Sequence, residues 1–258
     1  MKYRTEHFAF SGTALPRLRQ IGMDRPLAWL KAGWQDIKAH PLPSLAYGLL
    51  FALCGDLIIL ALIEYPHLLT VAISGFFFVA PLLAAGLYEL SRHNAAGESI
   101  LFIDSLKCFG RNGQSLAFFG LILALVGLFW ERLSAVAFAL VGATSAPVAS
   151  AYLNEIVFNG DHLLFTVTWF ALGGVLALVV YALSVVSVPL MLDRDSDVAT
   201  AIMTSLRAFT RNVGPLLLWA ALLVAMTLLG FATLLFGLIL IMPILGHASW
   251  HAYRELVE

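Results

Sequence analysis

Charged residues are scarce in this chain: Asp, Glu, Lys and Arg make up 12% of its 258 residues, whereas hydrophobic residues make up 60%. Soluble domains carry about 25% charged and about 45–50% apolar residues. The difference is too large for one buried core, so we expect lipid to be the solvent for much of the chain. The net charge of −1 predicts no nucleic-acid partner.

Cysteine and the common catalytic motifs are also lacking. Cys54 and Cys108 are the two cysteines, and we expect one within a membrane span and the other on the cytoplasmic side, so no disulfide is predicted. The first 25 residues carry basic groups without an apolar run, which predicts no cleavable signal peptide. No Walker loop, GxSxG elbow, HExxH or dinucleotide fingerprint occurs. We therefore predict no cofactor, and a catalytic site would have to be built among the helices.

What the chain has instead is long apolar stretches. A membrane-crossing helix needs about 20 predominantly apolar residues, because lipid offers no partners to backbone amides. Five stretches are long enough: 41–63, 65–88, 112–141 (interrupted by Glu131 and Arg132), 162–192 and 212–253. The last would be about 63 Å long as one helix, about twice the hydrocarbon thickness, so it is expected to fold back near Gly230. The sequence thus predicts an all-α polytopic membrane protein with six transmembrane helices, 162–192 being one long or tilted helix.

Basic residues orient these spans. With a cytoplasmic N-terminus, the inside segments are 1–40, 89–111, 193–211 and 254–258, and they hold 14 of the 15 Lys and Arg residues. Only Arg132 is left outside. Because Lys and Arg are retained on the cytoplasmic side, we predict that both termini are cytoplasmic.

An internal repeat underlies the spans. Residues 105–112 read SLKCFGRN and residues 205–212 read SLRAFTRN, and a weaker copy, WLKAGWQDIKAHP, precedes the first span. Each copy places apolar residues at i, i+4 and i+7, flanked by cations, as in an amphipathic helix lying in the inner membrane interface. The apolar positions are Leu30, Trp34 and Ile37; Phe102, Leu106 and Phe109; and Ile202, Leu206 and Phe209.

The second helix of each pair repeats a proline near its cytoplasmic exit, at Pro81, Pro189 and Pro243. The chain is therefore expected to contain three units, each an interfacial amphipathic helix followed by a helical hairpin. An alternative explanation is that topology rules alone make such segments look alike. The predicted organisation is a cytoplasmic tail (1–24) and one six-span domain (25–258), with units at about 25–92, 99–194 and 198–254.

Four segments carry a resemblance to a known family: WLKAGWQDIKAHPLPSLAYGLLFAL, PLLAAGLYELSR, SVVSVPLMLDRDSDVATAIMTSLRA and PILGHASWHAYREL. Together they resemble the prokaryotic multi-pass membrane proteins known as domain of unknown function 2189, over most of the chain from about Arg25 to Val257. The resemblance implies an integral protein of the bacterial inner membrane without an established activity. More loosely, the repeat resembles the non-catalytic membrane domain attached to some glycerophosphodiester phosphodiesterases.

Asp56 is the carboxylate expected inside a span. An ionised side chain at that depth costs at least about 2.5–3.5 kcal/mol unless it meets a polar interior. It is therefore a candidate proton or ion site. The alternatives are a protonated Asp hydrogen-bonded between helices, or a position near the outer surface.

His247 and His251 are four residues apart on one helix face. Such a pair can bind a metal, but a third ligand is missing nearby in the sequence. With Trp250 and Arg254 beside them, an interfacial anchor is the preferred interpretation. We therefore predict no metal site, with these histidines as the fallback candidates.

Two Arg–Asn pairs, Arg111–Asn112 and Arg211–Asn212, each precede a span. Arg offers a bidentate fork to phosphate, and the N-terminus of the following helix favours anions. They are candidate contacts for anionic lipid headgroups, although ordinary anchoring with Asn as an N-cap would give the same pattern.

The function predicted from these features is a non-enzymatic inner-membrane protein with a transporter-like, lipid-interacting or assembly role. Its expected partners are membrane lipids, anionic ones above all, and a second copy or another membrane protein. The alternative is an intramembrane enzyme, or a subunit of a membrane complex, that uses Asp56 or His247 and His251.

Overall fold

The computed structural model describes residues 15–62, 83–140 and 163–258, and this part of the chain is helical. The helices are α1 (Arg25–Ala39), α2 (Pro41–Leu62), α4 (Ala85–Ala95), α5 (Phe102–Ser105), α6 (Cys108–Arg111), α7 (Gly113–Leu140), α9 (Leu163–Ser184), α10 (Ser187–Arg194), α11 (Val198–Arg211), α12 (Val213–Ala232) and α13 (Leu238–Leu256). No β-strand occurs in these ranges, and Leu18 and Val257 form an isolated antiparallel bridge. The all-α prediction is confirmed.

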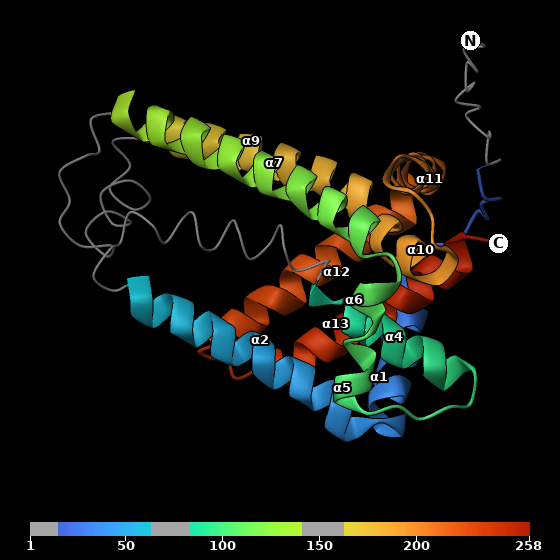
Figure 1. Cartoon of the computed structure of the whole chain (residues 1–258). Coiled ribbons are helices and arrows are strands. Elements are labelled where there is room, and N and C mark those ends of the chain that lie inside the picture. The colour runs from blue at the N-terminus through green and yellow to red at the C-terminus, as the bar shows by residue number, and fades with distance from the viewer. Residues whose placement is uncertain (1–14, 63–82, 141–162) are drawn as a thin grey trace, which may run out of the picture.

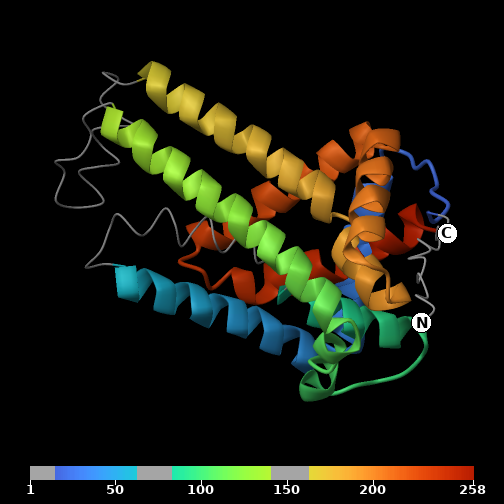
Figure 2. The same ribbon diagram turned by 45° about the horizontal axis from the view of Figure 1, so that its top comes forward.

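Long and short helices occupy different parts of the molecule, which we name the shaft and the polar end (Figure 1). The long helices α2, α7, α9 and α12 run away from one end of the molecule, where α1, α4, α5, α6, α10 and α11 gather. The view in Figure 2 shows the same division. Within the described residues, four helical stretches are long and apolar enough to cross a membrane: Pro41–Leu60, Gly113–Ala137, Leu163–Arg194 and Val213–Ala232. The polytopic prediction is thus confirmed in its coarser form, while the span expected at 65–88, with Pro81, falls largely outside the described residues.

The apolar stretch 162–192 is two helices and not the one expected. α9 ends at Ser184 and α10 begins at Ser187. Pro189 lies in the first turn of α10, where a missing amide hydrogen costs no intrahelical bond. The Val186 amide donates instead to Ser205 Oγ at 3.2 Å, so a side chain from α11 satisfies the backbone at the break.

The stretch 212–253 folds back as expected. α12 ends at Ala232 and α13 begins at Leu238, and the turn between them places Leu234 and Leu235 at positive φ. Gly230, the residue that suggested the turn, lies just before it. A Cβ there would clash with Leu238 Cδ2, so glycine allows α13 to approach the end of α12.

The interfacial helix expected over 99–111 is interrupted, because α5 and α6 are separate four-residue helices. Ser105 Oγ donates to the Phe102 carbonyl at 2.6 Å, an acceptor that an uninterrupted helix would offer to the Leu106 amide. Side-chain bonds of this kind compete with the helical ladder. The other two expected interfacial helices are continuous, as α1 and α11.

Three junctions link a short helix to a long one with nearly the same backbone geometry. His40, between α1 and α2, has φ −133° and ψ 69°. Asn112, between α6 and α7, has φ −129° and ψ 45°, and Asn212, between α11 and α12, has φ −132° and ψ 41°. In each case the junction carbonyl accepts a hydrogen bond from the amide four residues later, so the junction residue opens the following helix.

Close contacts join the helices to one another. Trp29 of α1 and Trp219 of α12 are buried and meet edge to face, with ring centroids 5.6 Å apart. Gly48 of α2 lies against the α13 backbone, where a Cβ would clash with the Ile239 carbonyl oxygen. These contacts join α1 to α12 and α2 to α13, and α1 also packs on α13, which positions the polar side chains described next.

Candidate functional site

Helix α4 carries two sets of polar side chains on different faces. Glu89, Arg92 and His93 share one face because they are three and four residues apart, and Ser91 and Asn94 share another. The first face forms what we name the Glu89 cluster: Glu89, Arg92, His93 and Arg111. The second joins what we name the His247 cluster: Asp36, Ser44, Ser91, Asn94, His247 and His251.

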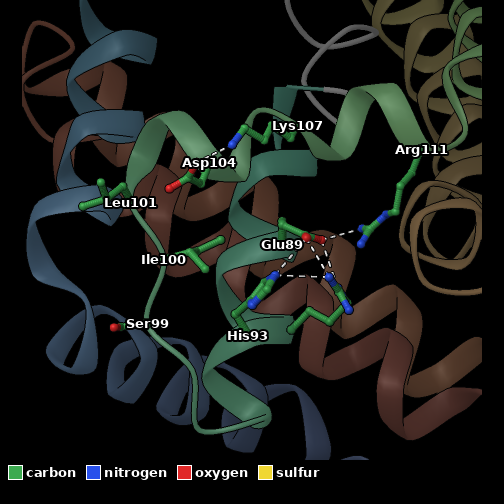
Figure 3. Close-up of a pocket in the computed structure, with 9 residues that line it drawn as sticks. Glu89, His93, Ser99, Ile100, Leu101, Asp104, Lys107 and Arg111 are labelled. Carbon is green, nitrogen blue, oxygen red and sulfur yellow. Dashed lines mark hydrogen bonds and ion pairs between the residues drawn. The ribbon is translucent and has the colours of Figure 1, made fainter.

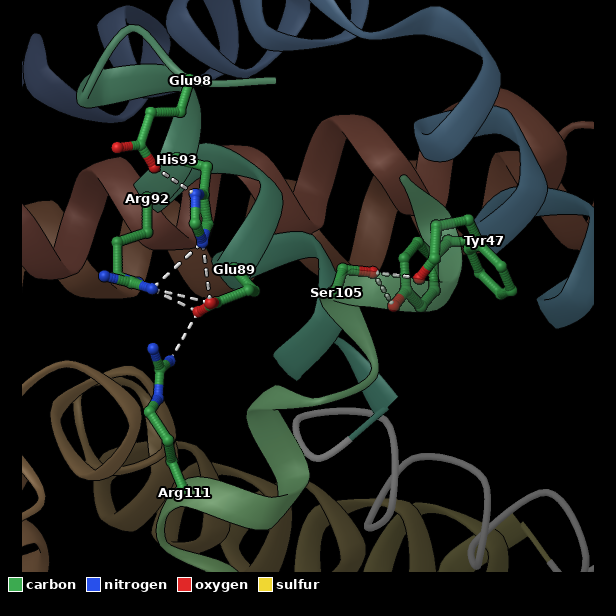
Figure 4. A network of polar contacts seen from close by, with 8 residues as sticks. Tyr47, Glu89, Arg92, His93, Glu98, Ser105 and Arg111 are labelled. Atoms are coloured by element: carbon green, nitrogen blue, oxygen red, sulfur yellow. Dashed lines mark hydrogen bonds and ion pairs between the residues drawn. The ribbon is translucent and has the colours of Figure 1, made fainter. Parts of the chain in front are cut away.

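The Glu89 carboxylate is the centre of its cluster, with a side chain only 7% exposed. Arg92 donates from Nε and Nη2 at 3.0 and 2.7 Å, and Arg111 donates from Nη2 at 2.6 Å (Figure 4). His93 Nε2 lies 3.1 Å from Glu89 Oε1, and His93 Nδ1 lies 2.8 Å from Glu98 Oε2. The carboxylate thereby holds two guanidinium groups from two different segments in fixed positions.

Burial and ion pairing oppose each other at Glu89. Burial alone would raise the pKa of its carboxyl, but the hydrogen bonds from Arg92 and Arg111 and their charges lower that pKa to about 2. The same contact raises the pKa of Arg92 above its ordinary value. Glu89 and Arg92 are therefore ionised throughout the physiological range.

A pocket of about 450 Å³ opens beside this cluster (Figure 3). Its lining includes Glu89, Arg92 and His93 from α4, Ser99, Ile100 and Leu101 from the following loop, and Asp104, Lys107 and Arg111 from around α5 and α6. Lys107 reaches Asp104 Oδ1 at 2.7 Å and is otherwise exposed. Arg111, a candidate headgroup contact in the sequence, thus lies in a pocket with Lys107, one of the cations that flank the expected interfacial helix, and with Arg92, which sequence reasoning did not select.

The two asparagines of the Arg–Asn pairs make contacts within the protein. Asn112 Nδ2 donates to the Met191 and Ser196 carbonyls at 3.0 and 2.9 Å. Asn212 is 3% exposed; its Nδ2 donates to the Arg19 carbonyl at 3.0 Å and its Oδ1 accepts from the Ile21 amide at 2.9 Å. Both side chains dock loop segments onto the polar end. Arg211, which precedes Asn212 in the sequence, is exposed and does not line the pocket.

Asp56 lies in α2 and is partly exposed. It makes no hydrogen bond or ion pair with the residues that the structure describes. The structure does not bring it near His247 or His251, and its assignment as a proton or ion site stays a prediction.

The His247 ring is held by two serine hydroxyls. His247, 1% exposed, has Nε2 2.9 Å from Ser44 Oγ and Nδ1 2.7 Å from Ser91 Oγ. Ser44 Oγ also donates to the His40 carbonyl at 2.8 Å. The ring therefore connects α13 with α2 and α4, next to the junction that begins α2.

Asp36 is the carboxylate of the same cluster. Its Oδ2 accepts from Ser91 Oγ at 2.6 Å and lies 2.9 Å from His251 Nε2, and its Oδ1 accepts from Asn94 Nδ2 at 2.6 Å. Burial alone would raise the pKa of Asp36, but the hydrogen bonds from His251 and Ser91 and the nearby imidazoles lower it below its ordinary value. The histidine pair thus belongs to a carboxylate–hydroxyl–imidazole network.

Sequence reasoning missed Asp36, although a signal was present. The buried residues of α1 include Trp29, Gly33, Asp36 and Ile37, which follow the i, i+4, i+7, i+8 pattern of one helix face. The predicted apolar face was instead centred on Trp34, which is 39% exposed. A carboxylate in register with a tryptophan and a glycine would have marked the packed face.

The two clusters differ in what they can do chemically. The pocket beside the Glu89 cluster is open and basic, so it can bind an anion. The His247 cluster is closed, because Ser44, Ser91 and His247 are at most 1% exposed, and it can exchange protons but cannot admit a substrate. Among the described residues, no group of three or more His, Cys, Asp or Glu side chains is placed to hold a metal ion.

Comparison with known proteins gives one family. The model of the family described as "Predicted integral membrane protein (DUF2189)" matches residues 68–193, which confirms the resemblance expected from the sequence. No curated protein and no solved structure matches the chain. The chain is therefore an integral membrane protein with several apolar helices that carries the DUF2189 family model over residues 68–193.

Proposed function

We propose that this protein is a non-enzymatic protein of the bacterial inner membrane that binds anionic lipid headgroups at the cytoplasmic end of its helices. The observation that carries the proposal is the pocket in which Arg92, Lys107 and Arg111 converge beside the Glu89 cluster. Basic pockets at the cytoplasmic ends of membrane helices suit phosphate-bearing headgroups.

The pocket keeps donors free for a ligand. Arg111 gives only one Nη2 hydrogen bond to Glu89, and a guanidinium has five N–H donors. Lys107 gives one to Asp104 and has three. Because Glu89 and Asp104 are two carboxylates against three cations, the pocket has a net positive charge that a phosphodiester would neutralise.

A six-span architecture of three units supplies the frame. The matched geometry at His40, Asn112 and Asn212 supports the repeat. So does burial at two positions counted back from each junction. The residues seven positions before the junctions are Gly33, Ser105 and Ser205. Those four positions before the junctions are Asp36, Cys108 and Ala208. All six are buried. In this architecture α13 is the sixth span, and the second includes residues outside the described part.

Packing between the units supports the same architecture. α1 of the first unit packs on α13 of the third, α11 of the third packs on α9 and α10 of the second, and α5 and α6 of the second pack on α4 of the first. Each interfacial segment therefore rests on the second helix of the preceding unit, in a cyclic order. A cyclic order of this kind is expected when similar units associate through the same surface.

The interfacial helices also have apolar sides that the protein leaves uncovered. Trp34, Leu106 and Phe109 are each more than a third exposed. On α11 the fully buried positions are the small or polar Ala201, Thr204, Ser205 and Ala208, whereas the expected apolar positions are only half-buried. Apolar side chains beside cations at the end of a membrane bundle favour contact with the lipid interface.

The orientation follows from charge. Among the described residues, Arg132 is the cation far along the shaft, about 28 Å from the start of α7 at 1.5 Å per residue. The polar end holds the other basic residues, so the positive-inside rule favours a cytoplasmic polar end, with both termini on that side.

Native mass spectrometry of the purified protein with added phosphatidylglycerol and cardiolipin tests the proposal. Lys107→Glu reverses a charge in the pocket at a side chain that is 77% exposed, so folding should be unaffected. Arg132→Glu makes the same charge change at the far end and is the matched control. We expect Lys107→Glu to weaken retention of anionic lipid about tenfold, as for the loss of one charge-assisted contact. Equal lipid retention by the two variants would refute the pocket as the site.

A further inference from the structure

The His247 cluster has more hydrogen-bond contacts than hydrogens in its ordinary protonation state. A serine hydroxyl has one hydrogen to donate. Ser44 gives its hydrogen to the His40 carbonyl, so Ser44 Oγ must accept from His247 Nε2–H at 2.9 Å. One N–H of the imidazole is fixed by this contact.

The other ring nitrogen requires a second hydrogen. If Ser91 donates to Asp36 Oδ2 at 2.6 Å, Ser91 Oγ must accept from His247 Nδ1–H at 2.7 Å, and the ring is an imidazolium. If instead the Asp36 carboxyl is protonated and donates to Ser91 Oγ, then Ser91 donates to Nδ1 and the ring is neutral. Both arrangements contain one proton more than an ionised Asp36 beside a neutral His247.

The two arrangements are connected by the same atoms. When the Asp36 proton moves to Ser91 Oγ, the Ser91 proton moves to His247 Nδ1, and no proton is gained or lost by the pair. His251 provides an outer contact, because its Nε2 lies 2.9 Å from Asp36 Oδ2 and its side chain is 30% exposed. A hydrogen-bonded route thus runs from a partly exposed imidazole to a buried one.

The surroundings of His247 act on a shared proton in opposite directions. Asp36 Oδ2 lies 3.8 Å from Nδ1, and His40, at the junction between α1 and α2, is a further imidazole near the ring. α2 and α4 contribute the uncharged Ser44 and Ser91, with the Leu87 carbonyl facing the ring, and His251 lies one turn away on α13. Burial, the largest of these influences, and the two other imidazoles disfavour a cation on the ring, whereas Asp36 and the Leu87 carbonyl favour it.

We propose that Asp36, Ser91, His247 and Ser44 form a proton-binding relay that holds one proton shared between Asp36 and His247 and exchanges it through His251. Loss of that proton leaves one of the four contacts without a hydrogen. Because the contacts join α1, α2, α4 and α13 beside the His40 junction, proton occupancy is coupled to the packing of the first interfacial helix and the first span. This role is independent of headgroup binding at the pocket.

Nitrogen NMR of ¹⁵N-histidine-labelled protein in nanodiscs tests the relay by reporting which ring nitrogens of His247 carry hydrogen. The His247→Gln variant assigns the signals of this ring, and infrared spectroscopy reports whether the Asp36 carboxyl is protonated. We expect His247 to carry hydrogen on both ring nitrogens, or Asp36 to be protonated, from about pH 5 into the range around pH 7 where unperturbed imidazoles lose their charge. A neutral His247 beside an ionised Asp36 throughout about pH 5–8 would overturn the proposal.

Ser91→Ala separates the relay from a structural role. Removing this hydroxyl should abolish the extra proton at pH about 7 and make Asp36 and His247 titrate independently. Ser105→Ala is the control, because Ser105 is also buried but bonds to Tyr47 and the Phe102 carbonyl. Retention of the shared proton in Ser91→Ala would refute the relay, and if this variant fails to fold, the wild-type spectra decide the question.

Discussion

Replacing Glu89 with Gln removes the carboxylate that both Arg92 and Arg111 contact. The pKa of Glu89 falls from an ordinary value of 4.5 to about 2, and each pKa unit corresponds to about 1.36 kcal/mol. That difference sets an upper limit of about 3 kcal/mol on the stabilisation. Because the arginine side chains are 33% and 36% exposed, solvent screening reduces the expected loss to about 2 kcal/mol.

The pH dependence of Glu89 has a definite sign. Its folded-state pKa lies below its unfolded value, so the stabilisation is complete above about pH 4.5 and is lost as the pH falls towards 2. The Glu89→Gln variant lacks this contribution at neutral pH. Its stability should therefore fall less steeply than that of the wild type over this acid range.

Thermal unfolding in a non-ionic detergent measures both effects. A loss of about 2 kcal/mol should lower the apparent melting temperature at neutral pH by about 4–8 °C for a chain of this size. Glu98→Gln is the control, because Glu98 contacts only His93 in this cluster and is 63% exposed. An unchanged melting temperature and acid profile for Glu89→Gln would refute the view that this ion-pair network stabilises the polar end.

The Glu89→Gln variant also tests the pocket, because it should strengthen lipid binding while it lowers stability. Without Glu89, the guanidinium groups of Arg92 and Arg111 have more free donors and the pocket gains positive charge. Anionic lipid should therefore bind more tightly and raise the melting temperature of Glu89→Gln more than that of the wild type. General damage to the fold would weaken both stability and lipid binding, which distinguishes the two explanations.

Three further outcomes follow from the packing. Gly48→Ala should lower the free energy of unfolding by about 3 kcal/mol, because the new Cβ would clash with the Ile239 carbonyl oxygen. Gly174→Ala is the control in the same thermal unfolding experiment and should have no measurable effect, because a Cβ there has nothing within 4 Å. Cys108 should not react with maleimide at pH about 8 until the protein is denatured. The reason is that burial, together with the nearby charge of Glu89, raises the pKa of its thiol to about 12. Rapid labelling of the folded protein would contradict this. Asn212→Ala should accelerate tryptic cleavage in residues 17–21 and lower stability by about 1–3 kcal/mol, because the Asn212 side chain holds that segment, and an unchanged cleavage rate would argue against its docking role.

Local sequence was sufficient to predict the structure where one physical requirement dominates. Apolar length predicted membrane helices because lipid cannot satisfy backbone amides, and the 42 residues of 212–253 exceeded what one span can use, which predicted the turn found after Gly230. The break at Val185–Val186 was not predicted, because Ser205, a residue of another helix, satisfies the freed amide. The interruption after Ser105 depends likewise on a hydroxyl that bonds its own backbone.

The candidate sites likewise include residues that local sequence could identify and residues that only tertiary contacts bring together. The charge pattern marked Arg111 as a candidate headgroup contact, because cations next to a span are a property of the sequence itself. Lys107 precedes Arg111 by four residues in the same segment, whereas only the tertiary structure placed Arg92 beside them, since it comes from α4. The tertiary structure also showed that Asn112 and Asn212 bind backbone carbonyls within the protein.

By itself the sequence determined that this chain is helical and membrane-embedded, which follows from composition, period and the solvation of backbone groups. The tertiary structure alone decided that Asp36 meets His247 and His251, residues more than 200 positions away. Sequence separation says nothing about such a contact, because α1 and α13 are brought together by the glycine at position 33, whose missing side chain lets the α13 backbone approach. Long-range packing of this kind fixes which buried polar groups face each other, and hence where a proton can be held.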